Sequence, residues 1–239
     1  MTPLHGAKTT QSVKIPSGKF RGLMAVSDKR GVIRAAAMDQ RGSLKKSIAK
    51  AKGVDPKEIT SSMMAEFKTA VSRVLTPYAS AILLDPEYGL EAVKARAKGA
   101  GCLLAYESTG YDQTQPGRIP ELIPDWTVKK SLENGADCIK VLLYYSPFEK
   151  SGINAIKHAF VSRIGAECAH YDVPFFLEFV GYDVAGGDDR RAGAECPHCE
   201  PHLLVGVRRF RSRPRRHADQ NLRELRTGTG RQQQESVRI

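Results

Sequence analysis

The sequence has little cysteine, a single tryptophan and no long apolar run. Its five cysteines (Cys102, Cys138, Cys168, Cys196 and Cys199) are too few and too scattered along 239 residues for a disulfide framework. No window approaches the roughly 18 to 20 uninterrupted apolar residues of a membrane span. The first twenty residues carry three lysines with no apolar run between them, so no secretory signal is visible. These absences predict a soluble, cytoplasmic protein.

Lysine is absent from the last third of the chain. All 17 lysines lie before residue 158, whereas all 12 basic residues after residue 182 are arginines. This change marks a compositional boundary at residues 181–189. We therefore expect a structured domain over residues 1–185 and a basic, poorly ordered tail over residues 186–239.

The tail has three interpretations. Residues 208–216 are rich in arginine, so the tail could bind the phosphate groups of RNA or DNA. The plainer alternative is a solvated segment without a core. Cys196, Cys199 and His202 have the spacing of metal ligands, but a closed zinc site normally needs a second pair. The interpretation that we prefer is an out-of-frame reading of the gene, because lysine and the family motifs described below disappear at the same boundary.

Before the boundary, short apolar runs alternate with amphipathic segments. Five runs are typical of parallel strands buried on both faces: Val32–Asp39, Ser80–Asp85, Cys102–Glu107, Asp137–Tyr145 and Val173–Val180. Helices are predicted between them, the first beginning at Asp55 and burying a row formed by Ile59, Met63, Phe67, Val71 and Val74. Strand and helix in alternation predict a parallel α/β fold.

Polar residues at the strand ends favour a barrel over a doubly wound sheet. Asp39, Asp85, Glu107 and Glu178 lie at or near the ends of predicted strands, and Lys140 lies within one. In a (β/α)8 TIM barrel the strand ends converge on one mouth, where the active site is built. The first strand also lacks the G-x-G-x-x-G turn of a dinucleotide-binding sheet. We expect an incomplete barrel of five recognisable strands.

A lysine inside an apolar strand has two interpretations. Burial lowers the pKa of an ammonium group, and a partly neutral Lys140 could attack a ketone to form an iminium. Glu178 and Asp39 are placed to move protons in such a reaction. Alternatively, Lys140 forms a structural ion pair with Glu107 or Glu178. Residue types alone leave both open.

Five motifs in order resemble the strand ends of the class I tagatose 1,6-bisphosphate aldolases. They are Ala37-Met38-Asp39-Gln40-Arg41-Gly42-Ser43-Leu44, Leu83-Leu84-Asp85-Pro86-Glu87-Tyr88-Gly89, Leu103-Leu104-Ala105-Tyr106-Glu107 with Thr109-Gly110-Tyr111-Asp112, Lys140-Val141-Leu142-Leu143-Tyr144-Tyr145, and Pro174-Phe175-Phe176-Leu177-Glu178. The resemblance covers roughly residues 15–185. It implies cleavage of D-tagatose 1,6-bisphosphate to dihydroxyacetone phosphate and glyceraldehyde 3-phosphate through a lysine Schiff base, without a metal or other cofactor.

The resemblance also assigns roles to single residues. Asp39 and Gln40 match residues that line the substrate pocket, Lys140 a lysine beside the reacting carbonyl, and Glu178 the acid that transfers protons. Asp85 and Glu107 are further candidates for substrate contact. The iminium-forming lysine of the family lies in a sixth-strand motif resembling Asp-Val-Leu-Lys-Val-Glu, which this sequence lacks. The phosphate loops of the last strands are expected in the same missing region, so we predict weak or no activity.

Two other functions fit the same residues. One is an inactive aldolase-like scaffold whose arginine tail binds nucleic acid, a partner that we regard as the less favoured one. The other is a related aldolase acting on a sulfonated fructose phosphate. The sequence leaves the oligomeric state open, and a homo-oligomer fits it.

Overall fold

The structure is a computed structural model and describes residues 15–182 and residue 184. Its helices and strands are α1 (Ser17–Val26), β1 (Ala35–Met38), α2 (Gly42–Lys52), the 3-10 helix η1 (Pro56–Glu58), α3 (Ser61–Leu75), the 3-10 helix η2 (Thr76–Tyr78), β2 (Ala81–Leu84), α4 (Leu90–Ala95), β3 (Gly101–Ala105), α5 (Val128–Glu133), β4 (Cys138–Tyr145), α6 (Ser151–His170) and β5 (Phe175–Gly181). The expected tail, with its arginine cluster and the Cys196–Cys199 pair, lies outside the described residues.

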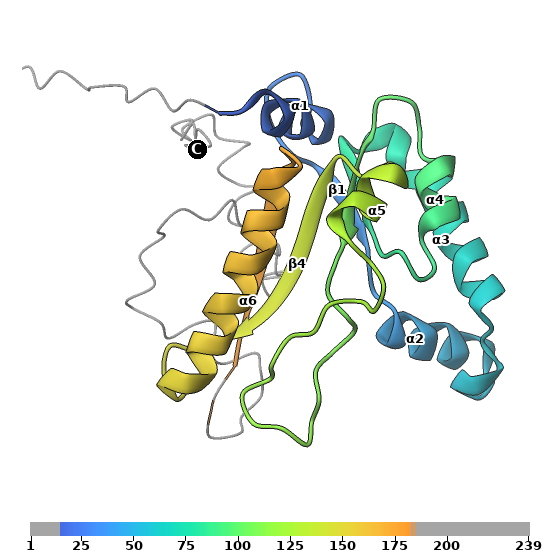
Figure 1. The fold of residues 1–239 in the computed structure, drawn as a ribbon. Coiled ribbons are helices and arrows are strands. Elements are labelled where there is room, and N and C mark those ends of the chain that lie inside the picture. The colour runs from blue at the N-terminus through green and yellow to red at the C-terminus, as the bar shows by residue number, and fades with distance from the viewer. Residues whose placement is uncertain (1–14, 183, 185–239) are drawn as a thin grey trace, which may run out of the picture.

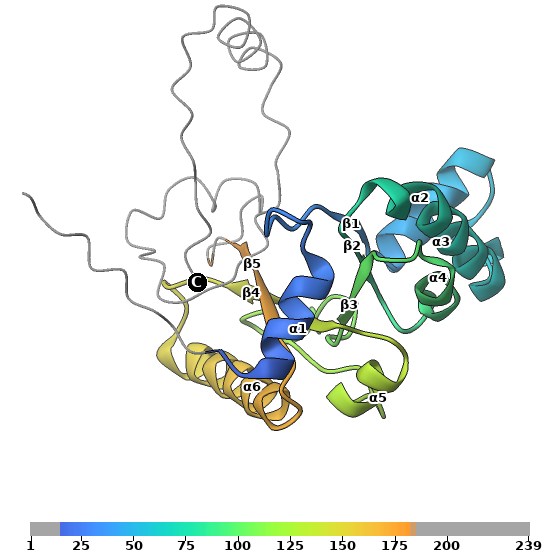
Figure 2. The ribbon, with the colours of Figure 1, turned by 90° about the horizontal axis from the view of Figure 1, so that it is seen from above.

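The five strands form one parallel sheet in the order β1-β2-β3-β4-β5. Each strand pairs with the next one along the chain, whereas a doubly wound sheet reverses its order at a switch point. The sheet is curved, and the helices from α2 to α6 lie along its outer side (Figures 1 and 2). The prediction of five strands of a (β/α)8 barrel is therefore confirmed.

The alternation of side chains along the strands separates an outer core from an inner one. The outer face of β4, with Ile139, Val141 and Leu143, packs against Ile164 of α6. The inner core consists of residues from α1 and four strands: Val26, Ala81, Leu83, Leu103, Cys138 and Phe176. These inner residues form an apolar floor, and the next inward positions toward the carboxyl ends of β4 and β5 are Lys140 and Glu178.

Helix α1 closes the amino-terminal end of the sheet. The carboxylate of Asp172, in the turn before β5, accepts hydrogen bonds from the Gly18 and Lys19 backbone N–H groups at 2.6 and 3.2 Å. An anion at a helix amino terminus is favourable because the first N–H groups have no partner within the helix. At Gly101, a Cβ atom would lie 2.4 Å from the Ala25 carbonyl oxygen, so only glycine permits this approach.

The structure corrects the predicted start and buried face of the helix after Asp55. Asp55 forms the expected capping box, but on η1, and α3 begins separately behind a Thr60 cap. The buried residues of α3 are Met64, Lys68 and Ser72. The predicted apolar row is therefore only partly right: Ile59 is buried, but Phe67 is 40% exposed and Val74 is 65% exposed.

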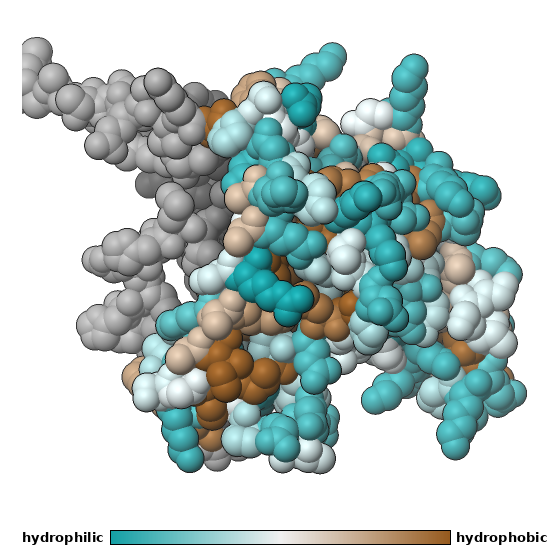
Figure 3. Space-filling view, in the orientation of Figure 1, coloured by the Kyte–Doolittle hydropathy of each residue, from teal (hydrophilic) through white to brown (hydrophobic). Residues whose placement is uncertain are grey.

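The surface of the described residues has a local concentration of apolar side chains. Figure 3 shows hydrophobic surface where β4 ends and α6 begins, the region that includes the exposed Phe148 and Ile156. None of the helices in the described part combines the length and apolar character needed to cross a bilayer.

Candidate active site

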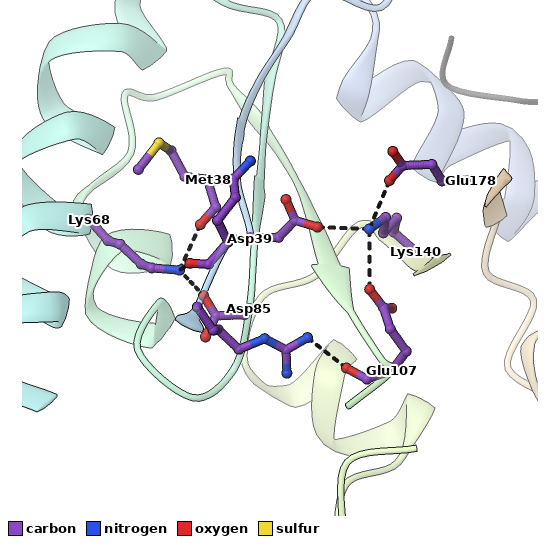
Figure 4. Close-up of polar contacts among 9 residues, drawn as sticks. Met38, Asp39, Lys68, Asp85, Glu107, Lys140 and Glu178 are labelled. Carbon is purple, nitrogen blue, oxygen red and sulfur yellow. Dashed lines mark hydrogen bonds and ion pairs between the residues drawn. The ribbon is translucent and has the colours of Figure 1, made fainter. Parts of the chain in front are cut away.

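Lys140 occupies the centre of a group of carboxylates above the apolar floor. Its Nζ atom lies 2.7 Å from Asp39 Oδ2, 3.0 Å from Glu178 Oε2 and 3.2 Å from Glu107 Oε1. Lys140 lies on β4 and Glu178 lies within β5, whereas Asp39 and Glu107 follow the ends of β1 and β3 (Figure 4). Four of the five strands therefore contribute to one cluster. The lysine side chain is 1% exposed, which makes the three carboxylates its dominant environment.

The surroundings of Lys140 keep it charged. Burial by itself lowers the pKa of an ammonium group, but here the attraction of Glu107, Asp39 and Glu178 outweighs burial and raises the pKa of Lys140 above its ordinary value. This direction favours the ion-pair interpretation of Lys140 over that of a partly neutral nucleophile, because a protonated amine has no lone pair with which to attack a carbonyl. The ion pairs of the alternative interpretation are present with both Glu107 and Glu178.

Glu107 is the most buried of the three acids. Burial raises the pKa of its carboxyl group, with the charge of Lys140 acting in the opposite direction. Its Oε2 atom is buried without a hydrogen-bond partner in the described structure. Arg41 fixes the same residue through a 2.7 Å hydrogen bond from Nη2 to the Glu107 carbonyl oxygen.

Asp85 is not brought to Lys140. Its carboxylate pairs with Lys68 of α3, and both side chains are fully buried, so neither presents surface to a ligand (Figure 4). Lys68 Nζ also donates to the carbonyl oxygens of Met38 and Gln40, at 2.8 and 2.9 Å. The pair therefore anchors α3 to the residues on both sides of Asp39, and Gln40 contributes its carbonyl to this anchor.

Two of these residues escaped sequence reasoning. Lys68 lies on a helix whose apolar residues suggest a different buried face, so its sequence context resembles that of a solvent-exposed lysine. Its burial becomes favourable only because Asp85 and two carbonyl groups surround it. Arg41 lies within the first strand-end motif, but its 8% exposure and its contact with Glu107 depend on the distant strand β3.

A second polar group lies nearer the carboxyl ends of β4 and β5. Lys157 of α6 is fully buried and donates a 2.9 Å hydrogen bond to the Tyr182 hydroxyl, just after β5. The same hydroxyl lies 2.7 Å from Glu149 Oε2 and 3.0 Å from the Gly117 carbonyl oxygen, so its single proton serves two acceptors. Burial lowers the pKa of Lys157 to about 8, although the nearby Glu149 opposes this shift.

The lowered pKa of Lys157 predicts stability that rises in alkaline solution. From about pH 8 up to its ordinary pKa of 10.5, the folded chain has lost this proton and the unfolded chain keeps it. The unfolded state then binds more protons, so the unfolding free energy increases with pH across that window.

Urea unfolding at a pH below 8 and again near pH 10 measures this effect. The increase in unfolding free energy between the two pH values should be larger for the wild type than for Lys157→Met. Lys150→Met, at an exposed residue just before α6, should behave like the wild type. Equal increases in unfolding free energy for the wild type and Lys157→Met would contradict the lowered pKa of Lys157.

The geometry around Lys140 suits acid–base chemistry on a carbonyl compound. The Asp39 and Glu178 side chains are 15% and 14% exposed and form the accessible side of the cluster. A fixed ammonium group stabilises an oxygen that gains negative charge, and adjacent carboxylates accept or return protons. Within the described range, no group of three histidine, cysteine, aspartate or glutamate residues is arranged to hold a metal ion.

Comparisons with known proteins identify the family of the chain. The model of the DeoC/LacD family aldolases matches residues 33–209, beyond the boundary expected near residue 185. A tagatose 1,6-diphosphate aldolase of Listeria monocytogenes serotype 4b is 54% identical over 176 residues, covering 74% of this chain and 51% of that protein. Tagatose 1,6-diphosphate aldolase 2 of Enterococcus faecalis is 49% identical over 205 residues, covering 86% of this chain and 60% of that protein.

A Schiff-base-forming fructose-1,6-bisphosphate aldolase is similar in structure, with a TM-score of 0.44, 12% sequence identity and coverage of 70% of this chain and 60% of that one. The chain spans about half the length of the curated Listeria relatives that it matches. The family match includes all five strands and the four residues of the Lys140 cluster. The chain belongs to the DeoC/LacD family of aldolases.

Proposed function

We propose that this chain supplies the first five strands of an aldolase site that cleaves D-tagatose 1,6-bisphosphate to dihydroxyacetone phosphate and glyceraldehyde 3-phosphate. The observation that carries the proposal is the charged Lys140 held by Asp39, Glu107 and Glu178 at the strand ends. Two relatives at about half sequence identity are named tagatose 1,6-diphosphate aldolases, which supports this ketose as the substrate.

In the proposed reaction, Lys140 donates a hydrogen bond to the oxygen of the reacting carbonyl and stabilises the charge that develops there. A separate lysine amine attacks that carbon, and loss of water gives the iminium. Glu178 then accepts the proton of the hydroxyl at C4 while the C3–C4 bond breaks. The bonding electrons enter the iminium to give an enamine, and the released fragment is the aldehyde. Protonation of the enamine and hydrolysis return the amine and dihydroxyacetone phosphate.

The remaining candidates bind substrate in this scheme. Asp39 and Gln40, at the end of β1, contact the sugar hydroxyl groups, and Glu107 orients Lys140. Asp85 has a structural part instead, because its carboxylate is fully buried against Lys68. The iminium-forming amine is the missing component, since Lys140 is protonated and the sequence has no sixth-strand lysine motif. We therefore propose that the chain binds its ligands and cleaves substrate weakly or not at all.

Binding and trapping measurements on the full chain test the proposal. Calorimetric titration should detect binding of dihydroxyacetone phosphate, with affinity roughly tenfold to one-hundredfold lower in Lys140→Met and Glu178→Gln, because each variant loses a charge-assisted hydrogen bond. Lys94→Met, at an exposed pair with Glu91, is the matched control and should bind like the wild type. Folding of every variant is checked by circular dichroism.

Two outcomes would contradict the proposal. A wild-type chain that does not bind dihydroxyacetone phosphate removes the proposed substrate class. Cleavage of tagatose 1,6-bisphosphate that is abolished by borohydride in the presence of dihydroxyacetone phosphate would refute the claim of weak activity. Mass spectrometry would then identify the lysine that forms the adduct.

A further inference from the structure

Arg41 is a buried arginine that lacks a carboxylate partner. It lies just after β1 and is 8% exposed. Within the described structure its guanidinium group makes one hydrogen bond, from Nη2 to the Glu107 carbonyl oxygen at 2.7 Å, and no described carboxylate forms an ion pair with it. A carbonyl oxygen accepts a hydrogen bond but leaves the charge uncompensated. Because an unpaired buried cation is costly, an anion from outside the described chain would stabilise this position.

The two buried lysines of the same region are already neutralised. Lys68 pairs with Asp85, and Lys140 is surrounded by the three carboxylates of its cluster (Figure 4). The strand ends thus supply carboxylates to two buried cations and leave Arg41 with a carbonyl group alone. Of these three cations, Arg41 is therefore the one whose charge an anionic ligand can neutralise.

The remaining N–H groups of Arg41 can be reached from outside. In the part of the chain that the structure describes, Nε and Nη1 of Arg41 have no acceptor. The described side-chain atoms that are both sealed from solvent and without a partner are Glu107 Oε2 and Asn154 Oδ1, so the Arg41 nitrogens keep accessible surface. A guanidinium group presents its N–H groups in a planar fork, which binds phosphate oxygens in a bidentate manner. The chemistry of the position therefore suits a phosphate monoester.

Glu107 links Arg41 to the Lys140 cluster. Its carbonyl oxygen accepts the Arg41 hydrogen bond, and its Oε1 atom lies 3.2 Å from Lys140 Nζ. The two cations are therefore separated by about the length of one glutamate residue. A ketose bisphosphate has its carbonyl at C2 and a phosphate at each end, so a molecule whose carbonyl lies at Lys140 can bring a phosphate to Arg41. Such a substrate needs two anion sites, and the loops of the last strands are the expected place for the other.

We propose that Arg41 binds one phosphate group of the ketose bisphosphate while Lys140 holds the carbonyl oxygen. The inference rests on the proposed function and adds a residue that determines specificity. The hydrogen bond to the Glu107 carbonyl orients the guanidinium group, and the phosphate supplies the anion that the buried charge lacks. Ketoses that carry this phosphate gain a charge-assisted contact, whereas those without it gain nothing from Arg41.

Calorimetric titrations of the full chain with D-tagatose 1-phosphate, D-tagatose 6-phosphate and the 1,6-bisphosphate test the assignment. Arg41→Gln keeps an amide donor for the Glu107 carbonyl oxygen but removes the charge. Its affinity for the bisphosphate and for one of the two monophosphates should fall roughly tenfold to one-hundredfold, and that for the other monophosphate should stay unchanged. Arg41→Lys, which keeps the charge but not the planar fork, should show the same selective loss by a smaller factor. Arg21→Gln is the matched control, because Arg21 is an exposed residue of α1 at the opposite end of the sheet.

The outcomes separate this inference from the proposed function. The monophosphate that loses affinity identifies the phosphate group that Arg41 binds. Equal losses for all three ligands would mean that Arg41 only positions Glu107, and wild-type affinities for all three would mean that it contributes nothing to binding. Either result refutes the phosphate assignment while the aldolase site stands. If the wild type binds none of the three ligands, both proposals fail. Urea unfolding shows whether each variant is folded, and if Arg41→Gln is not, the selectivity of Arg41→Lys decides by the same criteria.

Discussion

Replacing Lys140 by methionine is expected to lower the free energy of unfolding by about 3 to 5 kcal/mol at neutral pH, because removing one partner of a buried ion pair leaves the other charges uncompensated. Three carboxylates would then face one another, and that of Glu107 is only 9% exposed. Urea unfolding followed by circular dichroism measures the change. The same substitution at Lys94, which pairs with Glu91 at the surface, should change the unfolding free energy by no more than about 1 kcal/mol.

The pH dependence of Lys140→Met gives an independent check. Without the ammonium group, which lowers the pKa of Glu107, burial raises the pKa of that carboxyl group further above its ordinary value. The folded state then binds more protons than the unfolded state, so the unfolding free energy of the variant should increase as the pH falls from 7 toward 5. Adding Glu107→Gln should restore part of the loss at neutral pH. If the unfolding free energy of Lys140→Met lay within about 1 kcal/mol of the wild-type value, the four residues of the cluster would not form a closely coupled charge group.

The strands were predictable because each is a short apolar run that ends in a polar residue, a local property of the sequence. Lys140 was also predictable as an unusual residue, since an apolar strand with one lysine is visible in the sequence. Its charge state was not predictable. That state depends on Asp39, Glu107 and Glu178 reaching within 3.2 Å of one nitrogen, and these residues belong to different strands. Burial alone gives the opposite sign for the pKa shift.

Lys68 and Arg118 show a second limit of sequence reasoning. The apolar row of α3 indicates one buried face, but the structure buries the adjacent row, which includes Lys68. That choice follows from partners supplied by β1 and the residue after β2, so no helical periodicity encodes it. Arg118 lies in the segment between β3 and α5, which has no periodicity, and its guanidinium group lies over the rings of Tyr111 in that segment, Tyr144 of β4 and Tyr182 just after β5.

Lys68→Met is expected to destabilise the protein by about 3 to 5 kcal/mol as well, because it leaves Asp85 as a fully buried carboxylate without a cation. The carbonyl oxygens of Met38 and Gln40 lose the same donor, so the chain on both sides of Asp39 loses an anchor. We therefore expect an effect on the Lys140 cluster, although Lys68 does not touch it. Calorimetric titration with dihydroxyacetone phosphate should show weaker binding under conditions where the variant remains folded.

Two matched variants test this reasoning. Ser72 is buried on the same row of α3 and donates a 2.8 Å hydrogen bond to the Ala92 carbonyl, so it anchors α3 to α4 rather than to β1. Ser72→Ala should therefore lower the unfolding free energy by only about 1 kcal/mol and leave ligand binding unchanged.

The second variant combines Lys68→Met with Asp85→Asn. It removes the unpaired buried charge and keeps an acceptor for the Tyr88 N–H group. It should therefore recover stability but not ligand affinity. Recovery of both would mean that Lys68 neutralises Asp85 without positioning Asp39. Loss of affinity without loss of stability in Lys68→Met would mean that the pair is not the structural anchor that its burial implies.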